Sequence, residues 1–174
     1  MSSLPLGKHN AVCIGIIDMG TQKDFAEGFS RKVALLWEVC VGDQKKTTSR
    51  EYTYSFKRGE PLRSHLESWR GKPFTEAALA DFKLCKVLGV PCKIEMKKNK
   101  KNEQKYVGGI YRFPRTEETP KSDTEYIVFD FDDEKTYANL SRVPEYLIQR
   151  IIQTPEAKAV ELWKSGYRRP KLSF

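Results

Sequence analysis

Apolar residues gather, with polar residues between or beside them, in five short runs in the first two thirds of the chain. Each run is rich in β-branched or aromatic residues and is bounded by glycine, proline or a charged turn, a pattern that indicates β-strands. The runs occupy residues 10–18, 31–41, 50–56, 91–98 and 105–113. We therefore predict five strands in this part of the chain.

Between the third and fourth runs the apolar spacing changes from that of a strand to that of a helix. Pro61 suits the first helical turn and Gly71 suits the end, while Thr75 is a suitable N-cap for a second, shorter helix. The apolar face of the first helix, which we expect in the core, consists of Leu62, Leu66 and Trp69.

The predicted order is three strands, a helix and two strands, which is the order of an OB-fold, a five-stranded barrel with a helix between strands three and four. We therefore expect a mostly β protein in which residues 1–113 form an OB-fold barrel. An SH3-like or other small barrel is the structural alternative, because the number of strands does not fix their pairing.

After residue 113 the composition changes. Residues 114–125 are rich in proline, threonine and charge, which is typical of a linker or long loop. Residues 126–174 are predicted to form a short strand and two helices that pack on the barrel or on a partner, the second helix running from Thr154 to Gly166 and carrying Trp163. The apolar face of the first of these helices consists of Leu147, Ile148, Ile151 and Ile152.

Alternation also assigns the two faces of each strand. The second strand is expected to direct Val33, Leu35, Trp37 and Val39 into the core and to leave Lys32, Ala34, Leu36 and Glu38 toward a groove or solvent. In the fourth strand the inward set is Cys92, Ile94 and Met96. In the third strand Tyr52, Tyr54 and Phe56 oppose Thr53 and Ser55, and the aromatic set is expected in the core, since aromatics pack well on half-buried strands.

The chain is basic, with 31 Lys and Arg against 23 Asp and Glu, a net charge of +8 and a pI near 9.3. This balance favours a polyanionic partner. No apolar stretch approaches the roughly 20 residues that a membrane span needs, and the N-terminal residues lack a signal-peptide pattern. We expect a cytoplasmic protein without a membrane partner.

Four cysteines are widely spaced, form no C-x-x-C motif and have apolar neighbours. They are Cys13, Cys40, Cys85 and Cys92. We predict reduced, buried thiols, which argues against a zinc site or a disulfide framework.

The most cationic segment lies between the last two predicted strands. Its five lysines are Lys97, Lys98, Lys100, Lys101 and Lys105. They can neutralise phosphates and release counterions, although a solvated turn is the ordinary use of such a charge run. An OB barrel binds oligonucleotides at this loop, which favours the binding interpretation.

Two tyrosines follow this loop. A base that stacks on an exposed aromatic gains roughly 1–3 kcal/mol regardless of its identity. Tyr106 and Tyr111 fall on opposite faces of a regular strand, so both can stack bases only if a bulge at Gly108–Gly109 resets the register. The predicted nucleic-acid-binding residues are Lys32, Thr53, Ser55, Lys57, Arg58, Lys93, Lys97, Lys98, Lys100, Lys101, Lys105, Tyr106, Tyr111 and Arg112.

Several segments, taken together in their order and spacing, resemble a bacteriophage replication-module family of OB-fold single-stranded-DNA-binding proteins. They are "LPLGKHNAVCIGIIDMGTQ", "RKVALLWEV", "YTYSF", "LRSHLESWRGKPFT", "FKLCKVLGVPC" and "FDFDDEKTYANLSRVPEYLIQRII", from residue 4 to about residue 155. The resemblance implies sequence-nonspecific binding of single-stranded DNA in phage replication or recombination, within the host cytoplasm. The basic tail "SGYRRPKLSF" differs from the acidic tip of bacterial single-strand-binding proteins.

Two alternatives remain. The barrel could bind another protein, with the terminal helices as its interface. Asp130 and Asp132 could instead hold Mg²⁺ in a nuclease, with Asp18 as the one remote partner. We favour a binding protein that is not an enzyme and has no catalytic residues, metal or cofactor. Its expected partner is single-stranded DNA, and replication or recombination proteins and a homo-oligomeric state are compatible with the sequence.

Overall fold

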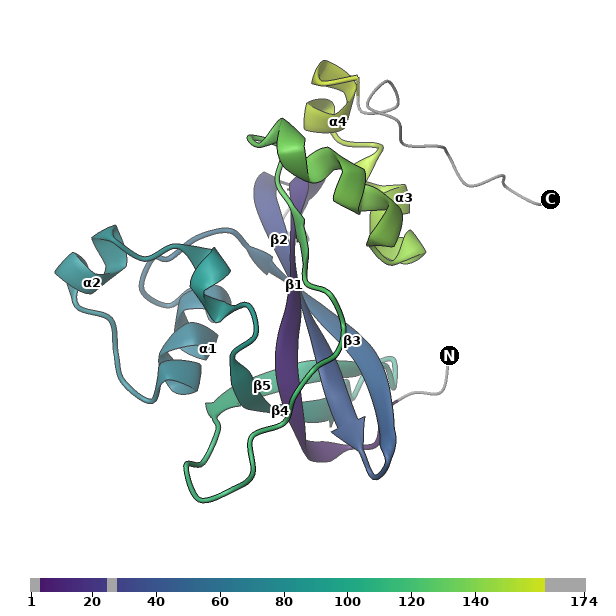
Figure 1. Ribbon diagram of the computed structural model, residues 1–174. Helices are drawn as coiled ribbons and strands as arrows, with labels where there is room; N and C mark the ends of the chain where they lie inside the picture. The colour runs from purple at the N-terminus through teal and green to yellow at the C-terminus, as the bar shows by residue number, and fades with distance from the viewer. Residues whose placement is uncertain (1–3, 25–27, 162–174) are drawn as a thin grey trace.

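The computed structural model describes residues 4–24 and 28–161. The described chain forms one six-stranded sheet and a few short helices (Figure 1). The strands are β1 (Gly7–Lys23), β2 (Phe29–Val41), β3 (Gln44–Thr53), β4 (Pro91–Lys98), β5 (Lys105–Arg112) and β6 (Ile127–Phe129). Neighbours pair in the order β3-β2-β1-β4-β5 with antiparallel ladders, and β6 pairs in parallel with β1.

The predicted strands are present, but the boundaries of the third were wrong. β3 begins at Gln44, directly after the two-residue turn Gly42-Asp43, and ends at Thr53. A two-residue loop brings the following residues straight into register with β2, so the polar segment pairs although it lacks apolar alternation. Tyr54 and Phe56 consequently lie beyond the strand.

The two predicted helices between β3 and β4 are present, and a 3₁₀ turn that was not predicted follows them. These three segments are α1 (Pro61–Arg70), α2 (Glu76–Ala80) and the 3₁₀ turn η1 (Leu84–Val87). α1 begins at Pro61 and ends at Gly71, which has a left-handed backbone with φ 72°. The Thr75 side chain accepts a hydrogen bond from the Ala78 amide and caps α2.

The first hydrophobic core lies between one side of the sheet and α1. It contains the predicted inward residues of β2 and β4 and the predicted apolar face of α1, including Trp69. Trp69 Nε1 also donates to the Pro91 carbonyl at 3.0 Å. The edge strands β3 and β5 approach each other through the Arg50 guanidinium, which donates to the Val107 carbonyl, but no ladder joins them in the described residues.

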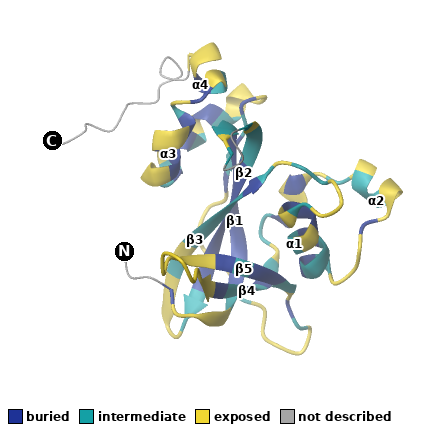
Figure 2. Ribbon diagram, turned by 180° about the vertical axis from the view of Figure 1, so that it is seen from behind, coloured by how far each residue is buried: buried dark blue, intermediate teal, exposed yellow. Residues whose placement is uncertain are grey.

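A second core covers the opposite side of β1 and β2. The 3₁₀ segment η2 (Glu134–Arg142), α3 (Glu145–Ile151) and α4 (Pro155–Ala159) pack there together with β6. The prediction that Ala34, Leu36 and Glu38 face a groove or solvent was wrong. Ala34 and Leu36 are at most 1% exposed beneath these elements, and Glu38 is 8% exposed. Figure 2 shows the neighbouring strand β1 as buried. The C-terminal segment supplies the apolar cover that an outward-facing Leu36 requires.

Residues 114–126 are irregular; Glu117 pairs with Lys93 of β4 at 2.8 Å, and the part before β6 contacts β2 and β3. The Thr124 hydroxyl donates to Glu38, and Lys45 pairs with Asp123 at 3.3 Å. These contacts attach the segment that precedes β6. Gly166, Trp163 and the basic tail lie outside the described residues, and within those residues no helix is long and apolar enough to cross a membrane.

His65 gives the first core a measurable pH dependence. Its Nδ1 lies 2.9 Å from the Tyr52 hydroxyl, and burial, followed by the cations Arg50 and Lys97, lowers the pKa of His65 from 6.5 to about 4. The unfolded chain therefore binds more protons than the folded chain between these two values. The His65 contribution to stability is fully present above pH 6.5 and is lost as the pH falls toward 4.

We expect this loss to appear in urea unfolding at pH 7 and pH 5. The His65→Gln variant keeps a hydrogen-bonding group but removes the titration, so its free energy of unfolding should decrease less between the two pH values than that of the wild type. Equal decreases would show that His65 does not titrate differently in the folded chain.

Candidate nucleic-acid interface

A bulge in β5 places its two tyrosines on one face of the sheet. The register of β4 and β5 shifts between Glu95, which pairs with Gly109, and Met96, which pairs with Val107. Gly108 is thus the extra residue, and an extra residue exchanges the two faces of the strand beyond it. The sequence did not decide whether a bulge at Gly108–Gly109 resets the register, and the structure contains this bulge.

The strand pairs show which side chains share this face. Tyr106 is opposite Lys97, and Tyr111 is opposite Lys93, while Val107 and Ile110 point into the core. We define the lysine–tyrosine face as Lys8, Asn10, Lys93, Glu95, Lys97, Tyr106 and Tyr111, all on the outer side of β1, β4 and β5.

The two rings differ in their freedom. Tyr111 lies over Gly109, donates to Glu95 at 2.7 Å, and has the Lys8 amine 4.3 Å from its ring centroid. Tyr106 is 44% exposed and makes no ring contact with the other residues that the structure describes. Tyr106 is therefore the open aromatic surface, and Tyr111 is held in place beside it.

Glu95 is the acidic member of this face. The hydrogen bond from Tyr111 lowers the pKa of Glu95, and Lys97 lowers it as well, at an amine–carboxylate distance of 3.4 Å. The same hydrogen bond raises the pKa of Tyr111. Glu95 therefore stays ionised and orients Tyr111 and Lys97. The face is still positive, because its lysines Lys8, Lys93 and Lys97 outnumber this one carboxylate.

The β4–β5 turn adds further lysines next to Tyr106. Lys98 pairs with Glu103 at 2.7 Å, and Lys105 donates to the Leu4 carbonyl at 2.9 Å. Lys100 and Lys101 are exposed, and their side chains have no hydrogen-bond or ion-pair partner among residues 4–24 and 28–161. These two ammonium groups are thus available to an anionic ligand.

The remaining predicted residues do not lie on this face. On β1, Lys32 pairs with Gly20, whereas Met96, just before the β4–β5 turn, pairs with Gly7. At about 3.3 Å per residue, Gly7 and Gly20 lie roughly 40 Å apart along β1, so Lys32 is far from this turn. The Lys32 amine binds Asp24 and, at 2.9 Å, the Thr53 hydroxyl. Figure 1 shows the β4–β5 hairpin and the C-terminal helices at opposite ends of β1.

Between the two ends of β1, side chains of α3 cover the outer side of β3. The Tyr146 hydroxyl of α3 is hydrogen-bonded to Ser49, and Arg150 forms an ion pair with Glu51. The β4–β5 turn with its lysines and the end of β3 therefore do not form one continuous groove in this structure. Arg112 packs against Gly71 at the end of α1, away from the lysine–tyrosine face.

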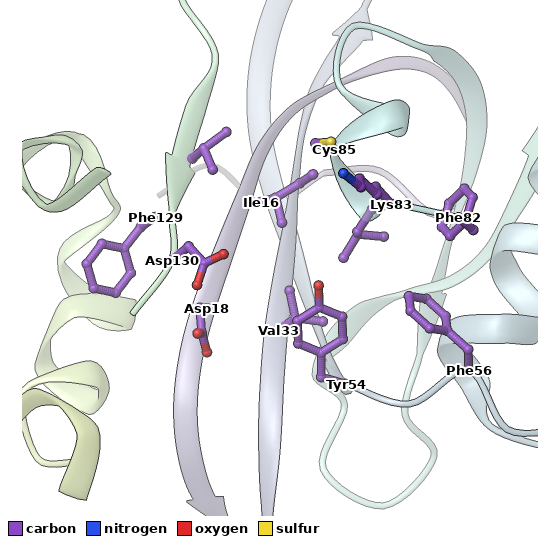
Figure 3. Close-up of a pocket in the computed structure, with 12 residues that line it drawn as sticks. Ile16, Asp18, Val33, Tyr54, Phe56, Phe82, Lys83, Cys85, Phe129 and Asp130 are labelled. Atoms are coloured by element: carbon purple, nitrogen blue, oxygen red, sulfur yellow. The ribbon is translucent and has the colours of Figure 1, made fainter. Parts of the chain in front are cut away.

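The segment that follows β3 lines a separate cleft, which we call the Tyr54 cleft (Figure 3). Tyr54 is 42% exposed and Phe56 is half-buried. The prediction that Tyr54 lies in the core was therefore wrong. Burial raises the pKa of Tyr54, and the carboxylates of Asp130 and Asp18 across the cleft raise it too. Ser55, Lys57 and Arg58 belong to this same segment.

Two of the four cysteines are buried as predicted. Burial raises the pKa of Cys13 to about 12 and raises that of Cys92. Cys40 is half-buried, and the prediction that Cys85 is buried was wrong, because Cys85 is exposed on η1 at the Tyr54 cleft. A 3₁₀ turn of four residues has no room for a second apolar face, and Leu84 and Val87 occupy the inward positions.

The acidic residues of the nuclease alternative surround an arginine. Asp18 is 4% exposed and accepts hydrogen bonds from Arg31 and, at 2.9 Å, from the Gly20 amide. Asp132 and Glu156 lie 3.7 Å and 4.0 Å from the same guanidinium. Among the residues that the structure describes, no group of three His, Cys, Asp or Glu side chains could hold a metal ion.

Comparison of the chain with protein-family models, with curated proteins and with solved structures finds no match.

Proposed function

We propose that this protein binds single-stranded DNA without sequence preference through the lysine–tyrosine face and the adjoining β4–β5 turn. The observation that carries the proposal is the Gly108 bulge, which brings Tyr106 and Tyr111 onto one outer face among lysines. Binding that tolerates any sequence combines a cationic track for phosphates with aromatic platforms for bases, and this face supplies both.

We further propose that the sheet is an OB-fold barrel. Its strand order and the position of α1 between β3 and β4 support this assignment. Arg50 joins β3 to β5 by a hydrogen bond at the place where a closed barrel would have a ladder. The resemblance to phage replication-module proteins suggests a task in phage replication or recombination, protecting single strands in the host cytoplasm.

In the proposed mechanism the backbone of the strand follows the lysines of the β4–β5 turn and of β4. Lys100 and Lys101 have unpartnered ammonium groups within the described chain and contact phosphates directly. Tyr106 stacks on a base. Tyr111 and Lys8 form a prepared cation–π pair beside it, which keeps the face flat and positive before DNA arrives.

The salt dependence of binding tests this proposal. Each phosphate contact on a single strand contributes about 0.7 to the slope of log K against log salt, so Lys100→Ala with Lys101→Ala should make the slope shallower by about 1.4. The measurement is fluorescence anisotropy of labelled oligo-dT between about 50 and 200 mM salt.

The control variant is Lys135→Ala with Lys158→Ala, which removes the same charge from two exposed lysines of η2 and α4. Its slope should stay close to that of the wild type. If both variants change the slope equally, the effect is one of net charge, and the β4–β5 turn is not the binding site.

A further inference from the structure

The Tyr54 cleft is a cavity of about 340 Å³ beside Ile16 and Asp18, near the middle of β1, and is separated along this strand from Gly7, which pairs with Met96 just before the β4–β5 turn. One wall comes from the segment after β3 and from residues 82–85, and the other comes from β1 and the end of β6 (Figure 3). Its volume is at the lower end of the range of about 300–1,000 Å³ for small-molecule pockets. Such a volume suits one flat group better than a folded segment.

Aromatic rings line one side of the cleft. The Tyr54 and Phe56 ring centroids are 6.0 Å apart, and those of Phe56 and Phe82 are 5.7 Å apart, both with edge-to-face geometry. Phe82 makes a further contact with Phe74 at 5.0 Å, which anchors this row to the first core. The row is therefore rigid at its inner end and exposed at Tyr54.

The two walls carry polar groups of opposite sign, a lysine on the aromatic wall and a carboxylate on the wall across from it. The Lys83 amine points into the cleft, and the Asp130 carboxylate lies across from Tyr54 (Figure 3). Asp130 Oδ1 accepts a hydrogen bond from the Asp132 amide at 2.9 Å, which leaves its second oxygen as an acceptor. Within the described residues the Lys83 side chain has no hydrogen-bond or ion-pair partner.

The chain around the cleft is cationic as well. Lys57 and Arg58 directly follow Phe56, and Lys83 and Lys86 flank Cys85, all of them exposed. A ligand with a flat aromatic ring and hydrogen-bonding edges matches these walls, because the ring faces Tyr54 and its edge faces Lys83 and Asp130. A phosphate attached to this ring lies outside the cleft, whose lining within the described chain carries Asp18 and Asp130 against the single cation Lys83.

We propose that the Tyr54 cleft holds one unpaired base of the bound strand, stacked on Tyr54 with its edge between Lys83 and Asp130. This inference rests on the proposed function and adds a second contact for the same DNA strand, near the middle of β1 and away from the lysine–tyrosine face. A strand of about 16 nucleotides, the upper end of the range bound by one OB fold, is the suitable probe.

Cys85 reports occupancy of the cleft without depending on total affinity. Cys13 and Cys92 are buried with raised pKa values and react slowly with maleimides. A Cys40→Ser background then leaves Cys85 as the reactive thiol among the four cysteines of the sequence. Maleimide modification of Cys85 is followed by mass spectrometry with and without saturating (dT)16, while anisotropy measures binding of the same oligonucleotide.

We expect (dT)16 to slow modification of Cys85 at least five-fold. We also expect Tyr54→Ala, at an exposed position beyond β3, to weaken (dT)16 binding roughly five-fold or more, as loss of a stacked base does. Tyr126→Ala removes another exposed tyrosine that does not line the cleft and should leave both readouts unchanged.

Binding of (dT)16 with an unchanged rate of Cys85 modification, or without an effect of Tyr54→Ala, would overturn the cleft inference and leave the lysine–tyrosine face as the site. Absence of (dT)16 binding in the anisotropy measurement would overturn the proposed function together with this inference. The two failures are thus separated by independent readouts.

Discussion

Replacing Tyr106 by alanine should weaken binding of oligo-dT roughly 5- to 150-fold, which corresponds to the 1–3 kcal/mol of a stacked base. The ring is 44% exposed on the outer side of β5 and contributes nothing to either core. Its removal therefore affects the ligand and not the fold. Fluorescence anisotropy with labelled oligo-dT at constant salt measures the loss.

Two control variants separate stacking from other effects. Tyr106→Phe keeps the ring and should bind within about two-fold of the wild type, because stacking uses the π face and not the hydroxyl. Tyr126→Ala removes a tyrosine of similar exposure, 46%, away from the lysine–tyrosine face and should bind normally. Unchanged binding by Tyr106→Ala would exclude this ring from the interface.

Replacing Phe129 by alanine should lower the free energy of unfolding by about 3–5 kcal/mol, the usual cost of deleting a large core ring. Phe129 is 1% exposed on β6 and packs on Phe131 and Tyr137 at centroid distances of 5.0 Å and 5.9 Å. β6 pairs with the middle of β1, so loss of this ring also weakens the sheet.

Urea unfolding at pH 7 measures this effect. Lys135→Ala, on the exposed side of η2, is the matched control and should change stability by no more than about 0.5 kcal/mol. A decrease below about 1 kcal/mol for Phe129→Ala would mean that the C-terminal segment is attached loosely and that β1 and β2 are stable without the second core.

Most of the first core could be predicted from the sequence because alternation is a local property. Ile94 is an inward residue of a run that alternates regularly, Trp37 shares its face with other large apolar residues at every second position of β2, and Leu66 follows helical spacing. The ends of α1 could also be predicted, because Pro61 and Gly71 determine the local backbone conformation by themselves.

The second core could not be predicted in the same way. Leu36 and Ala34 alternate with the inward residues of β2, and only the packing of distant helices explains why both faces of this strand are buried. The apolar faces of those helices were visible in the sequence, but the surface that they cover was not.

The candidate site was predicted in part for a similar reason. The β4–β5 turn and its lysines follow from the order of strands, whereas the common face of Tyr106 and Tyr111 depends on a bulge. The two adjacent glycines at 108–109 were the available signal. The separation of Lys32 from this turn depends on the length of β1, whose seventeen residues exceed the predicted run.

The most direct test of the account is a comparison of labelled oligo-dT with a duplex of equal length, by anisotropy, from about 50 to 200 mM salt. We predict tight binding to oligo-dT with a steep salt slope and much weaker binding to the duplex, whose stacked bases cannot reach Tyr106. Equal, weak binding to both ligands would contradict it, because the lysines would then attract polyanions without forming a site for unpaired bases.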